Sequence, residues 1–285
     1  MKNSLLLTSL FLFILTSCEE VPPYIDFGTT VKTKDTTYIT SNIPAPQHKA
    51  VLIEDITGVQ CNNCPKAATK AKEIITQKTE DSVVLIGVYT THLPNFTTPY
   101  SGFPDLTSMY SFQIVDALGA PTGLPSGYVD RAIISPQTVR FNAYTTWGNL
   151  VNTRLKLKTK VNIEIEKTLS ANLVTAKLKL TYTENESSTH KYSLFLTEDN
   201  VQSKQAMPDG AKPKDDYIHN HVLRYAFGIS TGNPLKESLV AGRVFEKELS
   251  YEIPSNIVPN NCYLVCVVTD AITNEVVNVR QISLK

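Results

Sequence analysis

The sequence predicts an α/β domain followed by an all-β domain, and three observations support this. An apolar stretch at 51–56 leads through a short loop into a helix-like stretch, and a second apolar run follows at 83–89. From residue 161 onward, apolar and polar residues alternate in about seven short runs separated by turn residues. Strand, helix and strand form a right-handed parallel crossover, whereas repeated alternating runs are typical of a β-sandwich. A chain of 285 residues is long enough for two domains, each with its own core.

Residues 1–18 read as a lipoprotein signal peptide and are excluded from the fold. Lys2 supplies the positive start, and the apolar run that follows is too short to cross a bilayer as a helix. The run ends in Leu15-Thr16-Ser17-Cys18, which resembles a bacterial lipobox, in which the Cys becomes the acylated first residue of the mature chain. The alternative is an ordinary secretory signal cleaved near Ser17. Either processing places the mature protein outside the cytoplasm, where disulfides persist.

The charge balance and the expected location limit the classes of partner that the protein can have. Lysine and arginine together number 27, as do aspartate and glutamate, and no basic stripe stands out, so we expect no nucleic-acid partner. The expected partners are a membrane, through a lipid on Cys18, and an unidentified protein; no cofactor is predicted. Glu19-Glu20 resembles the acidic signal that sends some lipoproteins of gram-negative bacteria to the outer-membrane surface. We therefore predict a lipid-anchored outer-membrane protein that faces the surface, with the periplasmic face as the alternative.

Four segments come after the signal peptide. Residues 19–48 are rich in Thr and Pro and predict a tether, in which 37–43 could form an edge strand. Residues 49–135 are the α/β domain, 136–157 a connector helix around the only Trp, and 158–285 the β-sandwich. Within the sandwich, strands are expected at 161–166, 174–182, 191–197, 217–227, 243–251, 262–269 and 275–283. A long polar insert at 197–216 is expected to be a functional or mobile loop.

The possible chemistry begins at Cys61-Asn62-Asn63-Cys64-Pro65, between the first strand and the helix. At such a junction the unpaired N–H groups and the helix dipole stabilise a thiolate at Cys61, and Cys64, one turn on, is placed to resolve it. This spacing is typical of a dithiol that opens and closes as a disulfide. A static disulfide is the plain alternative. A zinc ribbon would need a second Cys or Cys/His pair with this spacing, and the sequence has none.

Two other groups of residues are interpreted as structural. His219 and His221 lie on one face of a predicted strand, but no third metal ligand is evident, so we expect an ordinary polar face and no metal site. Cys262 and Cys266 would lie about 13 Å apart in a strand. That distance excludes a disulfide between them, and we expect buried thiols that pack as small hydrophobic groups.

The first domain resembles a thioredoxin fold. It shares with that family a strand, C-x-x-C, a helix, a buried strand and then an X-Pro-Ser loop that runs into a strand. The resemblance implies that Pro125 is cis and faces the disulfide, with Pro121 as a weaker candidate, and that Asp55 is the buried acid of the strand before the first Cys. Gln60 stands where the family usually has Trp, and Asn62-Asn63 replace Gly-Pro, so the family's redox potential is not carried over.

The whole mature chain resembles the outer-membrane-protein-28-related lipoprotein family. The resemblance rests on the stretches 51–58 and 61–65, on Gly123-Leu124-Pro125-Ser126-Gly127-Tyr128-Val129-Asp130-Arg131, and on His219-Asn220-His221-Val222-Leu223-Arg224. It implies an outer-membrane or surface location and a thioredoxin-like domain followed by an immunoglobulin-like β-sandwich. It implies no agreed biochemical activity.

Two functions remain open at this point. In the favoured one, the protein is a binding or adhesion-type module and Cys61–Cys64 is a structural disulfide. In the alternative, it is an extracytoplasmic thiol–disulfide oxidoreductase. Cys61 would then be the nucleophile, Cys64 would resolve the mixed disulfide, Asp55 would accept the proton and Pro125 would shape the substrate groove. A cell surface offers no obvious source of reductant, which favours binding.

Overall fold

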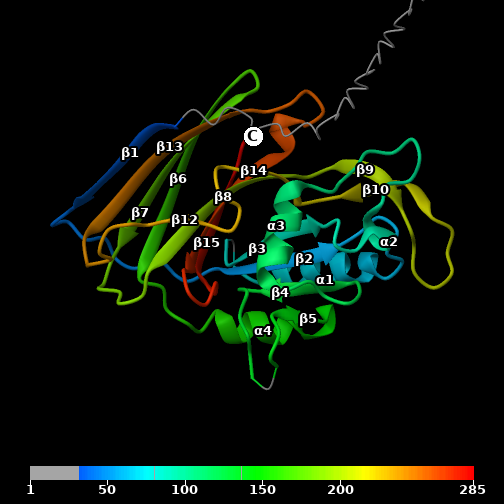
Figure 1. The fold of residues 1–285 in the computed structure, drawn as a ribbon, viewed down its shortest axis with the longest axis horizontal. Helices are drawn as coiled ribbons and strands as arrows, with labels where there is room; N and C mark the ends of the chain where they lie inside the picture. The colour runs from blue at the N-terminus through cyan, green and yellow to red at the C-terminus, as the bar shows by residue number, and fades with distance from the viewer. Residues whose placement is uncertain (1–31, 80, 136) are drawn as a thin grey trace, which may run out of the picture.

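The computed structural model describes residues 32–285 apart from 80 and 136. A four-stranded sheet has the order β1-β13-β7-β6, and a nine-stranded sheet runs β15-β14-β8-β11-β3-β2-β4-β5 with β12 beside β8 (Figure 1). A separate hairpin pairs β9 with β10. The predicted signal peptide, Cys18 and the tether residues before 32 lie outside the described part of the chain.

The elements up to residue 157 contain most of the helices. The strands are β1 (Lys32–Ile39), β2 (Val51–Thr57), β3 (Val83–Tyr89), β4 (Ser126–Val129) and β5 (Phe141–Asn142). The helices are α1 (Cys64–Thr76), α2 (Pro94–Thr97), α3 (Met109–Leu118) and α4 (Trp147–Arg154), with a 3₁₀ turn η1 (Tyr144–Thr146).

The rest of the chain is almost entirely β-structure. Its strands are β6 (Val161–Ser170), β7 (Leu173–Tyr182), β8 (His190–Glu198), β9 (Val201–Gln205), β10 (Lys214–His219), β11 (Val222–Ala226), β12 (Asn233–Pro234), β13 (Arg243–Glu252), β14 (Cys262–Asp270) and β15 (Val276–Ser283). A 3₁₀ turn η2 (Pro259–Asn261) precedes β14. No helix in residues 32–285, leaving aside 80 and 136, is long and apolar enough to cross a membrane.

The α/β part is built as the sequence predicts, around parallel strands β2 and β3 joined through α1. Both strands are buried on both faces, which explains their unbroken apolar sequence. Helix α1 covers one face through its Ala67, Ala71 and Ile74, and α3 covers the other. Strand β4 lies antiparallel to β2 on its far side.

The segment predicted as a connector is part of this core. Trp147 is fully buried and packs with α1 and β2 on one face of the sheet. A Cβ atom at Gly127 would lie 2.5 Å from the Trp147 ring, so only glycine permits this close approach on β4. Helix α4, which lies within the segment 136–157 predicted as a connector, therefore covers the sheet through the Trp147 side chain.

The last part of the chain forms a two-layer β-sandwich. Strands β6, β7 and β13 face β8, β11 and β14 across a core whose buried aliphatic and aromatic side chains come from residues 161–284, and the partly buried Tyr110 of α3 packs against it. Strand β1 adds an outer edge to this layer by pairing with β13. The edge strand expected at 37–43 thus begins earlier, at Lys32, and belongs to the sandwich layer.

One sheet runs through both halves of the molecule. Strand β11 pairs in parallel with β3 at Val222 and Gly87, and the Gly87 amide donates to the His221 carbonyl at 2.7 Å. A second core, between α3 and the inner face of this sheet, mixes residues of β2 and β3 with Phe195, Val265 and Val279. The boundary at residue 158 stays a prediction, because one core lies within 161–284 and the other is shared.

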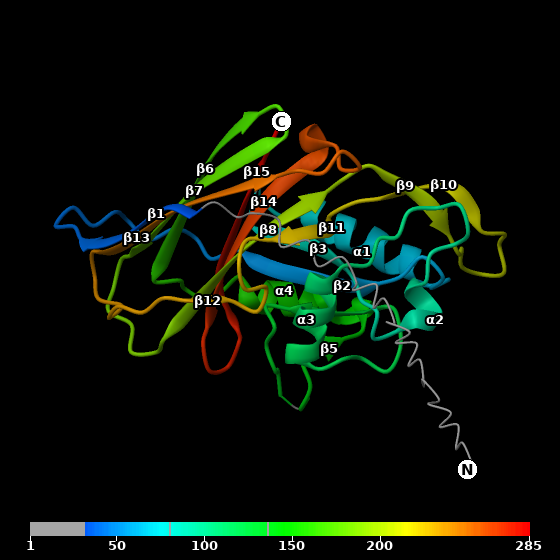
Figure 2. The ribbon, with the colours of Figure 1, turned by 45° about the horizontal axis from the view of Figure 1, so that its top comes forward.

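The run predicted as one strand at 217–227 is two strands. His221 has a φ of 58°, in the left-handed region, and this turn separates β10 from β11. The insert at 197–216 is largely ordered as well, because β8 extends to Glu198 and most of the remaining insert residues belong to the β9–β10 hairpin. Figures 1 and 2 show this hairpin at the end of the molecule opposite the β1-β13-β7-β6 sheet.

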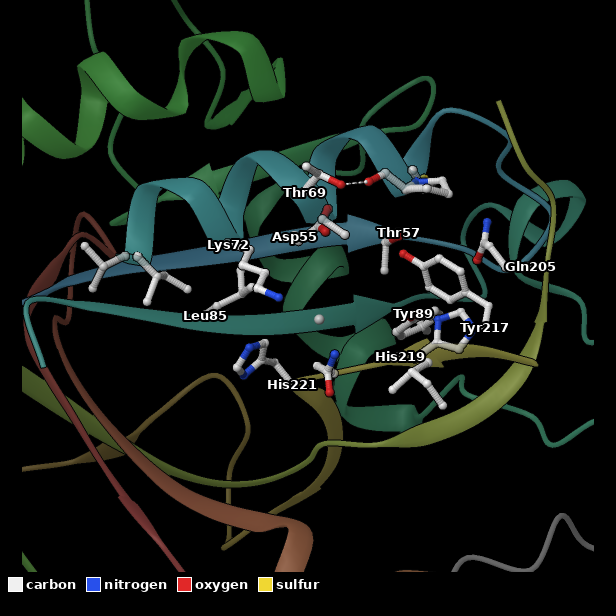
Figure 3. Close-up of a pocket in the computed structure, with 18 of the residues that line it drawn as sticks. Asp55, Thr57, Thr69, Lys72, Leu85, Tyr89, Gln205, Tyr217, His219 and His221 are labelled. Carbon is white, nitrogen blue, oxygen red and sulfur yellow. Dashed lines mark hydrogen bonds between the residues drawn. The ribbon is translucent and has the colours of Figure 1, made fainter. Parts of the chain in front are cut away.

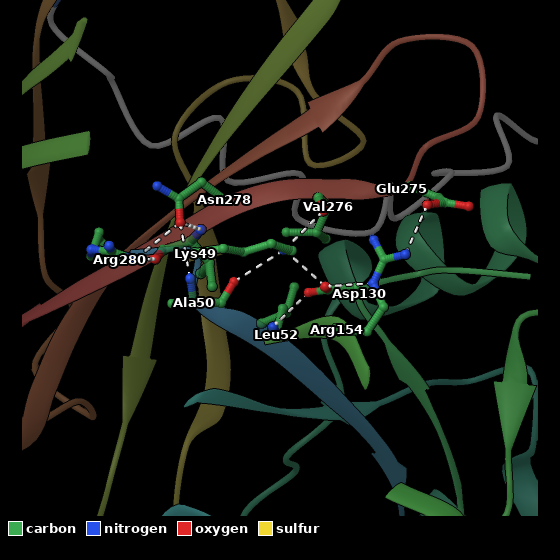
Figure 4. Close-up of polar contacts among 10 residues, drawn as sticks. Lys49, Ala50, Leu52, Asp130, Arg154, Glu275, Val276, Asn278 and Arg280 are labelled. Atoms are coloured by element: carbon green, nitrogen blue, oxygen red, sulfur yellow. Dashed lines mark hydrogen bonds and ion pairs between the residues drawn. The ribbon is translucent and has the colours of Figure 1, made fainter. Parts of the chain in front are cut away.

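A buried polar cluster ties the layers together around Asp130 (Figure 4). The Asp130 carboxylate accepts hydrogen bonds from the Leu52 amide at 2.9 Å and from the Arg154 Nε at 2.9 Å, and it pairs with the Lys49 amine at 2.8 Å. Both Lys49 and Asp130 are buried. Burial lowers the pKa of Lys49, and the negative charge of Asp130 opposes that shift.

A second buried ion pair adjoins this cluster. Arg131 donates from Nε and Nη2 to the two carboxylate oxygens of Glu54, at 2.9 and 2.6 Å. Such a two-point contact fixes the direction of the guanidinium as well as its position. Asp130 and Arg131 have φ values of 50° and 53°, so the chain reverses sharply where β4 ends. Asp130 and Arg131 therefore have a structural role: they form the turn at the end of β4 and hold it through buried ion pairs.

We expect Asp130→Asn to lower the free energy of unfolding by about 3–5 kcal/mol, because it leaves Lys49 and Arg154 without their buried counter-charge. Asparagine tolerates the left-handed backbone at this position. Urea denaturation at pH 7 measures the effect. Asp209→Asn is the matched control, since Asp209 also has a positive φ of 59° but pairs with Lys66 at the exposed surface. The control should leave the free energy of unfolding close to the wild-type value, and equal losses in both variants would contradict the assignment.

Candidate functional site

Cys61 and Cys64 form a disulfide just beyond the carboxyl end of β2, where α1 begins. Their Cα atoms are 5.4 Å apart. The Cys61 amide donates to the Gly58 carbonyl at 3.1 Å, so a tight turn places this residue before the helix. Cys61 is 1% exposed and Cys64 is 2% exposed. The disulfide is therefore present at the predicted strand-to-helix junction, but its residues are covered.

The β9–β10 hairpin supplies one part of that cover. Gln205 is buried at the end of β9, and its side-chain amide donates to the carbonyls of Cys61 at 2.8 Å and Gly58 at 3.3 Å. The Ala206 amide donates to the Val59 carbonyl at 2.8 Å. At the hairpin tip, Asp209 pairs with Lys66 of α1 at 2.9 Å. The second half of the chain thus binds the loop that carries Cys61.

The segment around α2 supplies another part. The Gln60 amide donates to the Phe96 carbonyl at 2.8 Å, and the Gln60 side chain donates to the Thr98 carbonyl at 2.7 Å. A Cβ atom at Gly58 would lie 2.3 Å from the Phe96 carbonyl oxygen, so the two loops pack backbone against backbone. Gln60, which stands where thioredoxins usually have Trp, therefore anchors one loop to another.

Beside the disulfide lies a pocket of about 340 Å³ between α1, β3 and residues 217–221 (Figure 3). Cys64 and Pro65 line one part of it, and Asp55 lines its wall on β2. Asp55 is 5% exposed, and its Oδ1 atom has no hydrogen-bond partner among the described residues. Burial raises the pKa of Asp55 to about 7. A buried carboxyl without partners prefers its neutral form, which explains the direction of the shift.

Two tyrosines, Tyr89 and Tyr217, line the same pocket as this carboxyl. Burial, together with the negative charge of Asp55, raises the pKa values of Tyr89 and Tyr217. The Tyr89 hydroxyl lies 2.8 Å from Nδ1 of His219, whose pKa burial lowers to about 4. His219 is thus a neutral buried partner of Tyr89. His221 lies in the following turn, where its amide donates to Asp199 at 2.7 Å.

The other residues singled out from the sequence lie in several places. The Leu124–Pro125 bond is cis, as the resemblance implies, and Ser126 pairs with Ile56, so the Pro125 loop meets the same edge of the sheet as Cys61. Among the described residues, no group of three or more His, Cys, Asp or Glu side chains could hold a metal. Cys262 and Cys266 are free and buried.

Sequence reasoning missed Gln205 and Tyr217, which the hairpin brings to the site from more than 140 residues away. No local pattern marks either residue, because their roles depend on how β9 and β10 fold back over α1. Tyr89 had a signal, since it ends a buried parallel strand at the edge where sites gather.

Comparisons with known proteins identify the family. A family model described as outer membrane protein Omp28 matches residues 114–285, which is more than half of the chain. The chain belongs to the Omp28 family. The Omp28 resemblance read from the sequence and the predicted outer-membrane location are thereby confirmed. The match begins within α3, so Cys61, Cys64 and Asp55 lie outside it.

The comparison with solved structures finds several matches, including the following two. HBP35 of Porphyromonas gingivalis superposes with a TM-score of 0.64 at 15% identity, over 84% of this chain and 76% of that chain. A domain of the outer membrane lipoprotein Omp28 from Porphyromonas gingivalis covers 44% of this chain and 88% of its own, at 21% identity and a TM-score of 0.32. The comparison with curated proteins finds no match. The HBP35 likeness extends over most of the chain and shows a shared fold.

Asp55→Asn should change how stability depends on pH. The pKa of Asp55 is raised in the folded state, so the unfolded chain loses its proton first, and wild-type stability should fall as the pH rises from about 4 to about 7. Asparagine does not titrate, so the variant should not show this fall in the free energy of unfolding. A pKa shift of this size corresponds to a fall of about 4 kcal/mol. Urea denaturation at pH 4, 5.5 and 7.5 measures it. Asp105→Asn, at an exposed carboxylate, is the control and should follow the wild-type curve. Parallel curves for wild type and Asp55→Asn would contradict the raised pKa.

Proposed function

We propose that this Omp28-family protein is a lipid-anchored binding module of the adhesion type, in which the Cys61–Cys64 disulfide is structural. The observation that supports this most strongly is the burial of both cysteines beneath the β9–β10 hairpin. A catalytic disulfide must meet the thiolate of its substrate, and reactive cysteines accordingly lie in partly exposed sites. Here the cover would have to move before any thiol reached Cys61.

The architecture supports a division of roles between two proposed domains. The thioredoxin-like description of 49–135 rests on β2-α1-β3, the Cys pair at the junction, and antiparallel β4 after Pro125. The immunoglobulin-like description of 158–285 rests on the two-layer sandwich. In this proposal the disulfide stabilises the loop on which the hairpin rests. The hairpin, at the end of the molecule opposite the outer sheet, is then held in place to meet a protein partner.

The lipid anchor rests on Leu15-Thr16-Ser17-Cys18. We expect Cys18→Ala to release the protein from the outer-membrane fraction, because it removes the acylated residue that would hold the mature chain in the bilayer. Fractionation of cells and the intact mass of membrane-purified protein measure this. Cys262→Ala is the matched control, since that cysteine is buried in the sandwich and should not affect the location. Wild-type membrane association of Cys18→Ala, or a mature mass without acyl chains, would refute the anchor.

A second candidate, a thiol–disulfide oxidoreductase, is favoured by Asp55. This carboxyl lines the same pocket as Cys64, and its pKa of about 7 lets it exchange a proton near neutral pH. In the reduced protein, the Cys61 thiolate would attack a substrate disulfide, form a mixed disulfide and release one substrate thiolate. Cys64 would then lose its proton to Asp55 and attack the Cys61 sulfur, which would release the second substrate thiolate and form the Cys61–Cys64 disulfide.

The reduction potential of Cys61–Cys64 separates the two candidates. A structural disulfide should lie below about −300 mV, whereas an oxidoreductase should fall between about −270 and −120 mV. Equilibration of the full chain with glutathione and dithiothreitol buffers measures it. A value in the higher range, together with mixed disulfides trapped through Cys61 in Cys64→Ser, would replace the binding proposal.

The β9–β10 hairpin, which covers the disulfide, provides a second test, in which the rate of reduction of Cys61–Cys64 is measured. Gln205→Ala should speed reduction by dithiothreitol, because it removes the side-chain contacts with the Cys61 loop. Gln202→Ala, on the same strand but exposed, should leave the rate unchanged.

A further inference from the structure

The pocket beside α1 contains a carboxyl group whose hydrogen-bonding capacity is not satisfied. Asp55 Oδ1 is buried without a partner among the described residues. A buried polar atom left unpaired costs free energy, so a donor supplied from outside would be favoured at this position. The pocket gives such a donor a route to the carboxyl, because Asp55 is part of its lining.

A positive charge lies on the helix wall of the same pocket. Lys72 extends from α1 over β3, across from the turn that holds His221 (Figure 3). Its neighbour Lys70 pairs with Glu73 at 3.1 Å, whereas Lys72 has no ion-pair partner in the part of the chain that the structure describes. Asp55 and Lys72 thus line one pocket without forming an ion pair with each other.

From this arrangement we infer that the pocket binds a small zwitterion, a free amino acid or a dipeptide, with its ammonium group at Asp55 and its carboxylate at Lys72. The inference does not depend on whether the disulfide is structural or redox-active. A zwitterion supplies the donor that Asp55 lacks and the anion that Lys72 lacks. A ligand with one charge would satisfy only one of the two groups.

The shape and lining of the pocket set the size and side chain of the ligand. Its volume of about 340 Å³ is at the small end of the range for ligand sites. Val83, Leu85 and Ile75 contribute apolar lining, and Gly87, between Leu85 and Tyr89 on β3, adds no side chain to it. We therefore expect leucine-like side chains to bind better than polar ones.

The charge states of the pocket predict how binding depends on pH. Of the groups that face Asp55, Tyr89 and Tyr217 have raised pKa values, and His219, with a pKa of about 4, is neutral above pH 5.5. The pKa of His221 is lowered by burial. Asp55 is then the pocket group that ionises near pH 7, and an ammonium ligand should bind about tenfold more weakly for each pH unit below this value.

Isothermal titration calorimetry on the full chain tests the inference with L-leucine and leucyl-glycine as probes. N-acetyl-leucine, which lacks the ammonium group, and leucinamide, which lacks the carboxylate, are the single-charge controls. We expect at least one zwitterion to bind, the acetylated form not to bind and the amide to bind more weakly. Whichever zwitterion binds more tightly distinguishes a free amino acid from a dipeptide.

Two variants locate the contacts. Asp55→Asn should weaken binding about tenfold or more and abolish the rise in affinity between pH 5.5 and 7.5. Lys72→Gln should weaken it only about threefold, because this amine is exposed, and Lys70→Gln on the same helix should have no effect. Thermal unfolding establishes that each variant is folded. No heat from either zwitterion with the wild-type chain, or equal affinity for N-acetyl-leucine, would overturn the inference and leave water as the occupant.

Discussion

The buried Asp130 carboxylate is the contact on which the arrangement of the layers depends. Its two oxygens bind the backbone of β2, the amine of Lys49 and the guanidinium of Arg154 on α4, and its carbonyl accepts the Val276 amide of β15. Removing several charges from water is costly, and the cost is offset only when every group finds a partner in good geometry. The chain meets that condition only when β2, β4, α4 and β15 are all in place. The cluster therefore favours one relative placement of the two halves.

That placement also decides what the disulfide can do. In an isolated α/β unit, the loop holding Cys61 would end at the open edge of a sheet, where solvent and substrates have access. Here, the parallel pairing of β11 with β3 brings β10 and its hairpin partner β9 over the same edge, and Gln205 occupies the carbonyls of Gly58 and Cys61. A motif that alone indicates exchange chemistry is thus enclosed by a segment more than 140 residues later in the sequence.

The sequence predicted the elements that depend on local pattern. Continuous apolar runs gave β2 and β3, the Cys pair with Pro65 marked the start of α1, and alternation gave the sandwich strands. Local pattern does not predict the features that long-range contacts determine. Periodicity does not reveal that the helix around Trp147 covers the sheet. Nor does it reveal that His221, whose amide donates to Asp199 in the turn after β8, has a left-handed backbone that divides the strand predicted at 217–227. Cys61, Cys64 and Asp55 could be found from spacing, but Gln205 and Tyr217 could not, since no local signal marks them.

The neighbours of Asp55 in the pocket explain why its Oδ1 atom has no hydrogen-bond donor. Tyr89 has its hydroxyl directed to His219, and Lys72 lies on the helix wall, so no described neighbour supplies the missing donor. A fold that needed only a stable core would do better with an apolar residue here, because a lone buried carboxyl lowers stability at neutral pH. Asp130 shows that this chain can satisfy a buried carboxylate completely when its role is structural. The contrast between the two aspartates supports the proposals that Asp55 exchanges a proton or binds a ligand.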